Sequence, residues 1–262
     1  MTLPPGFPFT QTALRAYMEC PYRFRLRYIE GVPWSALPPD PAAEAAVERG
    51  RHFHELTRQH FLGLDVAEQA IALGEQVQSW WQTLRDSPPD LTAYPQRYPE
   101  TGLSIPLGDY RLSARYDLLA IGKNRALIVD WKTGVDLARP ALAGDIQTRV
   151  YLYVLAVGGA SYHGGRPLPA AGLALLYWHP RGPQQVCLPY SPAQQAADAA
   201  RLAALVEEIA ARRPEDLVPT TVEATCNRCA YTTLCGKGSG SATEWEWAEE
   251  PALEAEGWQV GL

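Results

Sequence analysis

The chain has 262 residues, of which 47% are hydrophobic and 20% charged, and its formal net charge is −6. This length allows one large domain or two small ones with a sizeable buried core. No apolar run approaches the roughly 18 residues of a membrane-spanning helix, and the N-terminus lacks the basic start and apolar stretch of a secretory signal peptide. We therefore expect a cytoplasmic protein whose five cysteines are metal ligands or reduced thiols rather than disulfides.

The negative charge is concentrated near the C-terminus. Six glutamates and no lysine or arginine follow Lys237, so the remainder of the chain is formally neutral. Arginines gather near the start of the chain and again before residue 60, at Arg15, Arg23, Arg25, Arg27, Arg49, Arg51 and Arg58. The composition therefore excludes a uniformly basic surface, but it allows a local basic patch that binds nucleic acid.

The first third of the chain predicts helices. Thr10 is a typical N-cap residue, and helical spacing continues from it to residue 28, with an interruption at Pro21 directly after Cys20. Two further helices are expected over residues 42–62 and 66–85, separated from their neighbours by proline-rich stretches.

The middle of the chain predicts strands. A turn at Gly108 joins two of them, and a second short connection leads to a strand that ends at Asp130. The expected strands cover residues 103–107, 110–121, 171–178 and 184–188, besides the one before Asp130, and the expected later helices cover 143–157 and 192–212. This order predicts an α/β fold with a mixed central β-sheet flanked by helices.

Asp130, Trp131 and Lys132 end an apolar run and form the strongest candidate site. Because a strand alternates its faces, Asp130 and Lys132 project to one face and Trp131 to the other. Such a pair is often only a surface ion pair, but it can also hold a metal ion and position water beside a phosphate. Asp117 lies on the preceding strand, and a hairpin can bring it near Asp130, unless it merely faces solvent. Two carboxylates suit Mg²⁺ or Mn²⁺.

Two helices carry further candidates. His54 is a possible ligand because imidazole binds Mn²⁺ well, whereas His52 cannot share its helical face, so at most one of the two points at the site. Gln147 and Tyr151 are one helical turn apart and share a face. Their amide and phenol groups can bind a phosphate or a nucleotide sugar, although tyrosines on an apolar helix usually belong to the core.

Three cysteines, Cys226, Cys229 and Cys235, form a tight group that lacks a fourth ligand. Cys187 lies in a strand-like run where a buried free thiol is the better interpretation, and Cys20 lies at an exposed-looking bend. A site that includes Cys20 would join segments about 200 residues apart, so we expect metal loss to loosen the N-terminal helix. The spacing alone suits zinc and an iron–sulfur cluster equally.

Taken together, the ordered motifs resemble the RecB-type branch of the PD-(D/E)XK nuclease superfamily. The resemblance covers roughly Thr10 to Cys235 and includes the opening segment that contains Cys20. One early and three late cysteines resemble the iron–sulfur members of that branch, among them the CRISPR adaptation exonucleases and AddB-type nuclease domains. The motifs that carry the resemblance are Gly50-x-x-x-His54, Asp117, Asp130-Trp131-Lys132 and Gln147-x-x-x-Tyr151. Ala114 stands where the family commonly has glycine.

The resemblance implies a role for each motif residue. Lys132 would orient the attacking water, and Gln147 and Tyr151 would position the DNA. The Mg²⁺ or Mn²⁺ ligands would be His54, Asp117, Asp130 and the Trp131 carbonyl, and a [4Fe–4S] cluster would be bound by Cys20, Cys226, Cys229 and Cys235. The cluster would join an N-terminal segment (residues 1–41) to a C-terminal segment (191–237) around a restriction-endonuclease-like nuclease core (42–190).

The resemblance also implies a function. We expect a metal-dependent DNA exonuclease that prefers single-stranded ends, in DNA repair or recombination or in CRISPR adaptation. Because no G-x-x-x-x-G-K-[ST] motif is present, unwinding would need a helicase partner, and a CRISPR adaptation protein is the other candidate partner. The alternatives are a non-catalytic iron–sulfur subunit of a helicase–nuclease complex and a zinc-stapled protein of unrelated function. The acidic tail (238–262) is expected to be flexible, or else to dock on a partner or cover the DNA channel.

Overall fold

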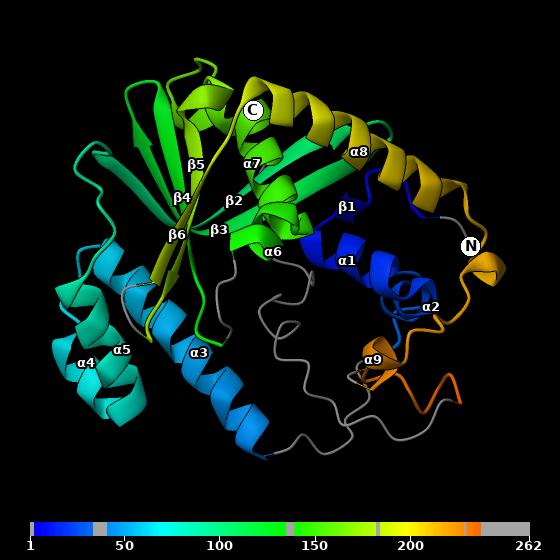
Figure 1. Ribbon diagram of the computed structural model, residues 1–262, viewed down its shortest axis with the longest axis horizontal. Helices are drawn as coiled ribbons and strands as arrows, with labels where there is room; N and C mark the ends of the chain where they lie inside the picture. The colour runs from blue at the N-terminus through cyan, green and yellow to red at the C-terminus, as the bar shows by residue number, and fades with distance from the viewer. Residues whose placement is uncertain (1–2, 34–40, 135–138, 182–183, 228, 237–262) are drawn as a thin grey trace.

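The strand-forming sequence between residues 96 and 131 folds into three consecutive antiparallel strands at the centre of the molecule. The structure is a computed structural model that describes residues 3–33, 41–134, 139–181, 184–227 and 229–236. The described residues form a six-stranded sheet with helices on both faces (Figure 1). The expected mixed α/β fold with a central mixed sheet is therefore confirmed.

The strands of the sheet are β1 (Pro8–Phe9), β2 (Gln96–Leu107), β3 (Tyr110–Gly122), β4 (Arg125–Trp131), β5 (Leu173–His179) and β6 (Gln184–Pro189). The α-helices are α1 (Gln11–Glu19), α2 (Pro21–Phe24), α3 (Pro41–Phe61), α4 (Ala67–Ala72), α5 (Glu75–Asp86), α6 (Arg139–Gly144), α7 (Ile146–Gly158), α8 (Pro192–Ala211) and α9 (Glu223–Cys226). Short π- and 3-10 segments are η1 (Arg25–Ile29), η2 (Gly159–Tyr162), η3 (Ala170–Gly172) and η4 (Pro214–Asp216).

Two turns set the register of the central strands. Gly108 has a φ of 59° between β2 and β3, a left-handed conformation that glycine adopts without strain. Asn124, with a φ of 57°, occupies the turn between β3 and β4. The chain then crosses over through α6 and α7 to β5, which pairs with β4 in parallel, and the sheet order is β1-β3-β4-β5-β6 with β2 paired to β3.

The two faces of the sheet bury separate cores. On one face, α1, α7 and α8 form the main core, in which Leu14 of α1 and Val150 of α7 are buried together with strand residues such as Ile128. On the other face, α3 and α5 pack over Trp131 and its neighbours and form the second core. Neighbouring residues of β4 alternate between these cores, as its pattern predicts. Trp131 is 1% exposed, so its truncation to alanine would cost about 3–5 kcal/mol.

Three predicted boundaries are wrong. The helix expected over residues 66–85 is divided into α4 and α5, because Gly74 has a φ of 94° between them. The helix expected over 143–157 begins at residue 146, since the side chain of Asp145 accepts a hydrogen bond from the Gln147 N–H and caps it. Strand β2 begins at residue 96 rather than 103, despite Pro99.

The N-terminal and C-terminal segments lie against each other beside the main cores. Leu26, Cys229 and Tyr231 form a small buried cluster of their own, and the Tyr231 hydroxyl donates to the Val32 carbonyl at 3.2 Å. Figure 1 shows α9 near α1 and α2. The acidic tail (238–262) lies outside the described residues. Within the described part of the chain, no helix combines the length and apolar character of a membrane span.

Candidate metal centre and catalytic site

Three carboxylates form one row across the central strands. The pairing Leu118↔Val129, extended by one residue, places Asp117 opposite Asp130. The pairings on either side of Glu100 place that residue opposite Asp117 on its other edge. Opposed residues in antiparallel strands share a face, and like charges in this arrangement are destabilising. The row therefore needs positive charge beside it.

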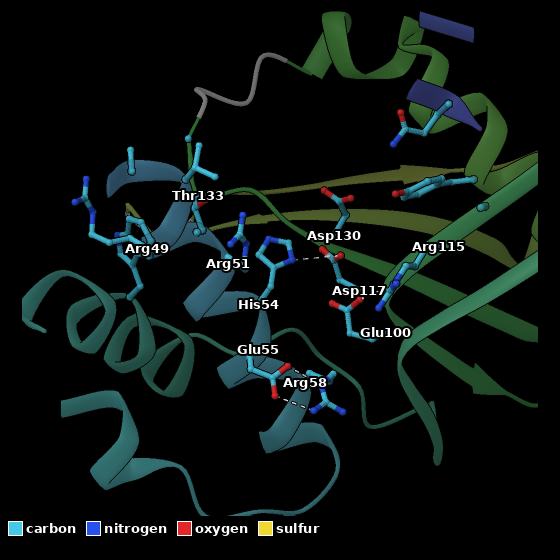
Figure 2. A pocket seen from close by; sticks show the side chains of 18 of the residues that line it. Arg49, Arg51, His54, Glu55, Arg58, Glu100, Arg115, Asp117, Asp130 and Thr133 are labelled. Carbon is cyan, nitrogen blue, oxygen red and sulfur yellow. Dashed lines mark hydrogen bonds and ion pairs between the residues drawn. The ribbon is translucent and has the colours of Figure 1, made fainter. Parts of the chain in front are cut away.

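His54 of α3 approaches this row from the face of the sheet that α3 and α5 cover. Its Nδ1 lies 3.4 Å from Asp117 Oδ1, and its Nε2 lies 3.0 Å from the Trp131 carbonyl oxygen. Figure 2 shows the ring directed at Asp117. The helix is fixed by Phe53, which stacks on Trp178 with a centroid distance of 5.8 Å. His52 instead lies 4.0 Å from Glu48, so only one of the two histidines faces the site.

The backbone of Trp131 connects the histidine to the carboxylate. Its N–H donates to Asp117 Oδ2 at 2.7 Å, while its carbonyl oxygen is the atom that His54 contacts. The side chain points the other way, into the second core. One residue thus fixes two candidate ligands while it anchors the strand end.

Lys132 and Asp130 share a face, as the strand alternation predicts. Lys132 Nζ lies 3.0 Å from Asp130 Oδ2 and donates to Gln147 Oε1 at 3.0 Å. The Gln147 amide nitrogen donates to Asp130 Oδ1 at 2.8 Å. These contacts close a triangle of side chains around Asp130, which is only 3% exposed. Because a buried carboxylate is costly without such partners, the triangle holds Asp130 in a defined position.

Tyr151 shares the helical face of Gln147, as their spacing predicts. It is buried and lines the cavity in front of Asp130 and Asp117, whereas Gln147 is not among the described residues that line that cavity. Burial raises the pKa of Tyr151 well above its usual value, and the nearby Asp130 and Asp117 act in the same direction. The hydroxyl is therefore a protonated donor at neutral pH.

The cavity in front of this row has a volume of about 670 Å³. Its described lining combines acidic, basic and aromatic side chains from α3, α5 and the central strands. The lining residues central to the site are His54, Glu100, Arg115, Asp117, Asp130 and Tyr151. This composition suits a ligand that carries negative charge and is held through a cation.

Two of the carboxyl groups differ in their ionisation. Burial and the neighbouring Asp117 raise the pKa of Glu100 to about 7, against the opposing effect of His54 and Arg115. Burial also acts to raise the pKa of Asp117, but His54, the Trp131 N–H and Lys132 outweigh it, so that pKa is lowered. A cation bound here would displace a proton from Glu100 at neutral pH.

Glu100 is the residue that the sequence reasoning missed. Ligand atoms of His54, Glu100 and Asp117 all lie within 4.8 Å of one another. Glu100 has a φ of 46°, a strained conformation for a residue other than glycine. Its carboxylate accepts from Arg115 Nε at 3.0 Å. Of the predicted ligands, His54 and Asp117 belong to this group and the Trp131 carbonyl adjoins it, while Asp130 lines the same cavity but pairs with Lys132.

The four predicted cluster cysteines line a second, smaller cavity. Cys20 lies at the junction of α1 and α2, and the other three follow α8 in or after α9. The described residues around this cavity include Cys20, Cys226, Cys229 and Cys235. Cys20 is buried rather than exposed, and Cys187 is exposed rather than buried. Cys187 is wrongly predicted because it lies on the edge strand β6, where its side chain is left exposed.

Comparisons with known proteins agree with this geometry. Residues 8–236 match the sequence profile of the PD-(D/E)XK nuclease superfamily. A search of curated protein sequences finds no match.

Solved structures similar to this chain include the following two. One is a protein from Eubacterium rectale, assigned as an exonuclease by inference, which is 12% identical with a TM-score of 0.51 over 88% of this chain and 87% of that chain. The other is SSO0001, 14% identical over 88% of this chain and 87% of its own, with a TM-score of 0.42. At 12% identity, the likeness to the first structure concerns the fold alone.

Proposed function

The chain belongs to the PD-(D/E)XK nuclease superfamily, and we propose that it is a divalent-metal-dependent deoxyribonuclease that digests DNA from its ends. The observation that carries this proposal is the row of Glu100, Asp117 and Asp130, with Lys132 3.0 Å from the last of these carboxylates. A row of opposed carboxylates beside a lysine is costly for the fold alone, and it suits a cation that meets a phosphodiester.

The proposed ligands of the cation are His54, Asp117, Asp130 and the Trp131 carbonyl, and we add Glu100 to them. Carboxylate and carbonyl oxygens suit Mg²⁺ and Mn²⁺, and the imidazole favours Mn²⁺. The bound ion would polarise the phosphate and lower the pKa of a coordinated water. The residues fit this role because the atoms of His54, Glu100 and Asp117 already converge.

Lys132, Gln147 and Tyr151 have separate roles in the proposal. The Lys132 ammonium orients the attacking water and stabilises the negative charge that develops on the phosphorus oxygens. Gln147 is a positioning residue, because its amide holds both Lys132 and Asp130. Tyr151 lines the cavity, where its hydroxyl can donate to a phosphate oxygen of the DNA.

The proposal includes a [4Fe–4S] cluster held by Cys20, Cys226, Cys229 and Cys235. Support comes from their common cavity and from the Tyr231 N–H, which donates to Cys229 Sγ at 3.5 Å. Four thiolates suit a tetrahedral zinc ion and a [4Fe–4S] cluster equally, and the cluster is proposed on the sequence resemblance. It would join residues 1–41 to residues 191–237.

Single-stranded ends are the proposed substrate. A cavity of about 670 Å³ admits a flexible single strand more readily than a stiff duplex. A cytoplasmic role in DNA repair and recombination or in CRISPR adaptation, with a helicase or an adaptation protein as partner, belongs to the same proposal and rests on the sequence resemblance.

Digestion of end-labelled DNA tests the proposal. Wild type and Lys132→Ala are incubated with linear single strands, linear duplex and circular single strands, in Mg²⁺ and in Mn²⁺. We expect the wild type to shorten linear single strands and to spare circles, and the variant to be inactive. Equal activity in both proteins would refute the catalytic role of Lys132. Tight DNA binding without cleavage would favour the alternative, a non-catalytic iron–sulfur subunit of a helicase–nuclease complex.

The purified protein's metal content tests the cluster. We expect a brown protein with broad visible absorbance and about four iron atoms per chain. A colourless protein with stoichiometric zinc would contradict the cluster and leave the nuclease proposal standing.

A further inference from the structure

The cavity in front of the carboxylate row, which we call the catalytic cavity, is lined by two groups of arginines. Arg58 donates two hydrogen bonds to Glu55, each of 2.7 Å, and Arg115 pairs with Glu100. The remaining arginines of the described lining are Arg49, Arg51 and Arg181. Within the part of the chain that the structure describes, these three form no ion pair with a carboxylate. One side of the cavity therefore carries neutralised arginines, and another carries uncompensated positive charge.

The uncompensated arginines line the same cavity as Thr133, the residue that follows Lys132. Gly50 packs against Thr133 so closely that a Cβ on Gly50 would lie 2.9 Å from Thr133 Oγ1, and Arg49 and Arg51 flank Gly50 in α3. Arg181 Nη2 lies 3.5 Å from the Thr133 carbonyl oxygen. We call Arg49, Arg51 and Arg181 the arginine corner. It adjoins the end of the strand that carries Asp130.

The arginine corner lies beside the candidate metal centre. In Figure 2, Arg49, Arg51 and Thr133 lie on one side of His54, and Glu100, Asp117 and Asp130 lie on the other. A strand whose phosphate meets the carboxylate row would thus present its next phosphates either to the arginine corner or to the side where Arg58 and Arg115 are already paired. Among the arginines of the described lining, those of the arginine corner are the ones without a carboxylate partner, so their charge is available to a phosphate.

Stability alone does not account for the arginine corner. Arg51 and Arg181 are exposed and Arg49 is half-buried, so none is needed to fill a core. Like charges gathered without acidic partners repel each other. A guanidinium binds a phosphate through two parallel hydrogen bonds, and such a ligand would remove the repulsion.

We propose that Arg49, Arg51 and Arg181 form a phosphate-binding subsite that holds the DNA strand beside the bond that is cut. The inference rests on the proposed nuclease function and deepens it, because it assigns the direction in which the uncut strand leaves the metal centre. The ligand is the sugar–phosphate backbone rather than a base, so the subsite contributes affinity without sequence preference.

Arg51 and Arg58 provide a matched pair for the test. They lie seven residues apart on α3, hence two turns apart on the same helical face, and both line the cavity. Arg51→Gln and Arg58→Gln each remove one positive charge. Binding of a fluorescent oligothymidine strand is measured in Mn²⁺ over a range of salt concentrations, with each substitution in a Lys132→Ala background that prevents cleavage. The triple variant Arg49→Gln/Arg51→Gln/Arg181→Gln is measured in the same way.

The proposal gives a distinct result for each variant. Arg51→Gln is expected to weaken binding about 5–10-fold and to reduce the slope of log Kd against log salt by about 0.7, the value for one lost phosphate contact on a single strand. The triple variant should reduce that slope by about 2. Arg58→Gln should stay within about twofold of the parent, with an unchanged slope.

Equal affinities and equal salt slopes for Arg51→Gln and Arg58→Gln would overturn the subsite. If the wild type cleaves DNA at the same time, only the subsite fails. If it does not cleave but the two variants differ as expected, the nuclease proposal fails and the subsite stands as a strand-binding site. Absence of DNA binding by the parent protein would refute both. Thermal unfolding of each variant checks that the fold is retained.

Discussion

The catalytic cavity and the cysteine cavity are held in place by different means. Around the catalytic cavity, strand register positions Glu100, Asp117 and Asp130, and extensive cores cover both faces of the sheet. Around the cysteine cavity, a small cluster of buried residues joins the two ends of the chain. Strand register therefore sets the geometry of the first site, whereas a few buried residues set that of the second.

The largest effect is expected from Asp117→Ala, which should lower the cleavage rate on the order of 1,000-fold. The fold should persist, because strand pairing rather than this carboxylate holds the sheet. Single-turnover cleavage and the Mn²⁺-induced rise in melting temperature measure the effect, and both should be lost. Asp109→Ala in the exposed turn of the same hairpin is the control. A large loss of stability in metal-free Asp117→Ala would contradict a preformed site.

Cys20→Ser tests the other side of the comparison. Loss of a ligand should release the iron and lower the melting temperature by about 5–10 °C. Because Leu14, Tyr17 and Phe24 are all buried in the main core, the loosening should begin after residue 24, as limited proteolysis would reveal. The exposed Cys187 gives the control Cys187→Ser. Unchanged iron content in Cys20→Ser would remove Cys20 from the proposed ligands.

Glu100→Gln should change how stability depends on pH. The pKa of Glu100 is raised to about 7 in the folded protein, so its neutral form is favoured there. The stabilisation of the fold that comes from neutral Glu100 is complete below the pKa of a glutamate in the unfolded chain, near 4.3. It is lost as the pH rises through about 7. The metal-free wild type should lose on the order of 1–3 kcal/mol between these limits.

Urea unfolding in EDTA at pH 5 and pH 8 measures this difference. Glu100→Gln cannot ionise, so its stability should fall less over this interval than that of the wild type. The exposed Glu68 supplies the control Glu68→Gln, which should behave like the wild type. Parallel pH profiles for Glu100→Gln and the wild type would contradict the assigned ionisation.

The smallest effect is expected from Arg15→Gln, which tests whether the two regions are connected. Arg15 of α1 pairs with Asp145 at 2.7 Å, and the same carboxylate caps α7 at the Gln147 N–H. Helix α1 ends beside Cys20, so it spans from one region to the other. We expect the single-turnover cleavage rate to fall about 2–5-fold as Gln147 loses its fixed position. The exposed Arg85 gives the control Arg85→Gln, and equal rates would mean that the regions act independently.

The sequence predicted the central part of the site because short connections leave little freedom. The few residues between β3 and β4 force the pairing that puts Asp117 near Asp130. The same reasoning extends to Glu100, since a two-residue turn that pairs Leu107 with Tyr110 also places residue 100 opposite residue 117. Proline is usually confined to the ends and edges of strands, so Pro99 argued against a strand that continues through residue 100. The left-handed backbone of Glu100 has no sequence signature.

Features that depend on distant packing were less predictable. The exposure of Cys20 was misjudged because the segment that buries it comes from the other end of the chain. The division of the helix at residues 66–85 follows from the backbone conformation of Gly74, and a single glycine within a helical pattern does not by itself end a helix. Local spacing therefore identified which residues belong together, and tertiary contacts decided how they are covered.

Trp131 makes the candidate metal centre and the second core parts of one cooperative unit. Its backbone holds Asp117 and His54, and its ring stacks on Phe61 of α3 at a centroid distance of 5.9 Å. Local opening of α3 would therefore separate His54 from the carboxylates, and a ligand that links them must oppose that opening. Binding of a ligand at the site should consequently slow amide hydrogen exchange along the whole length of α3, far from the site itself.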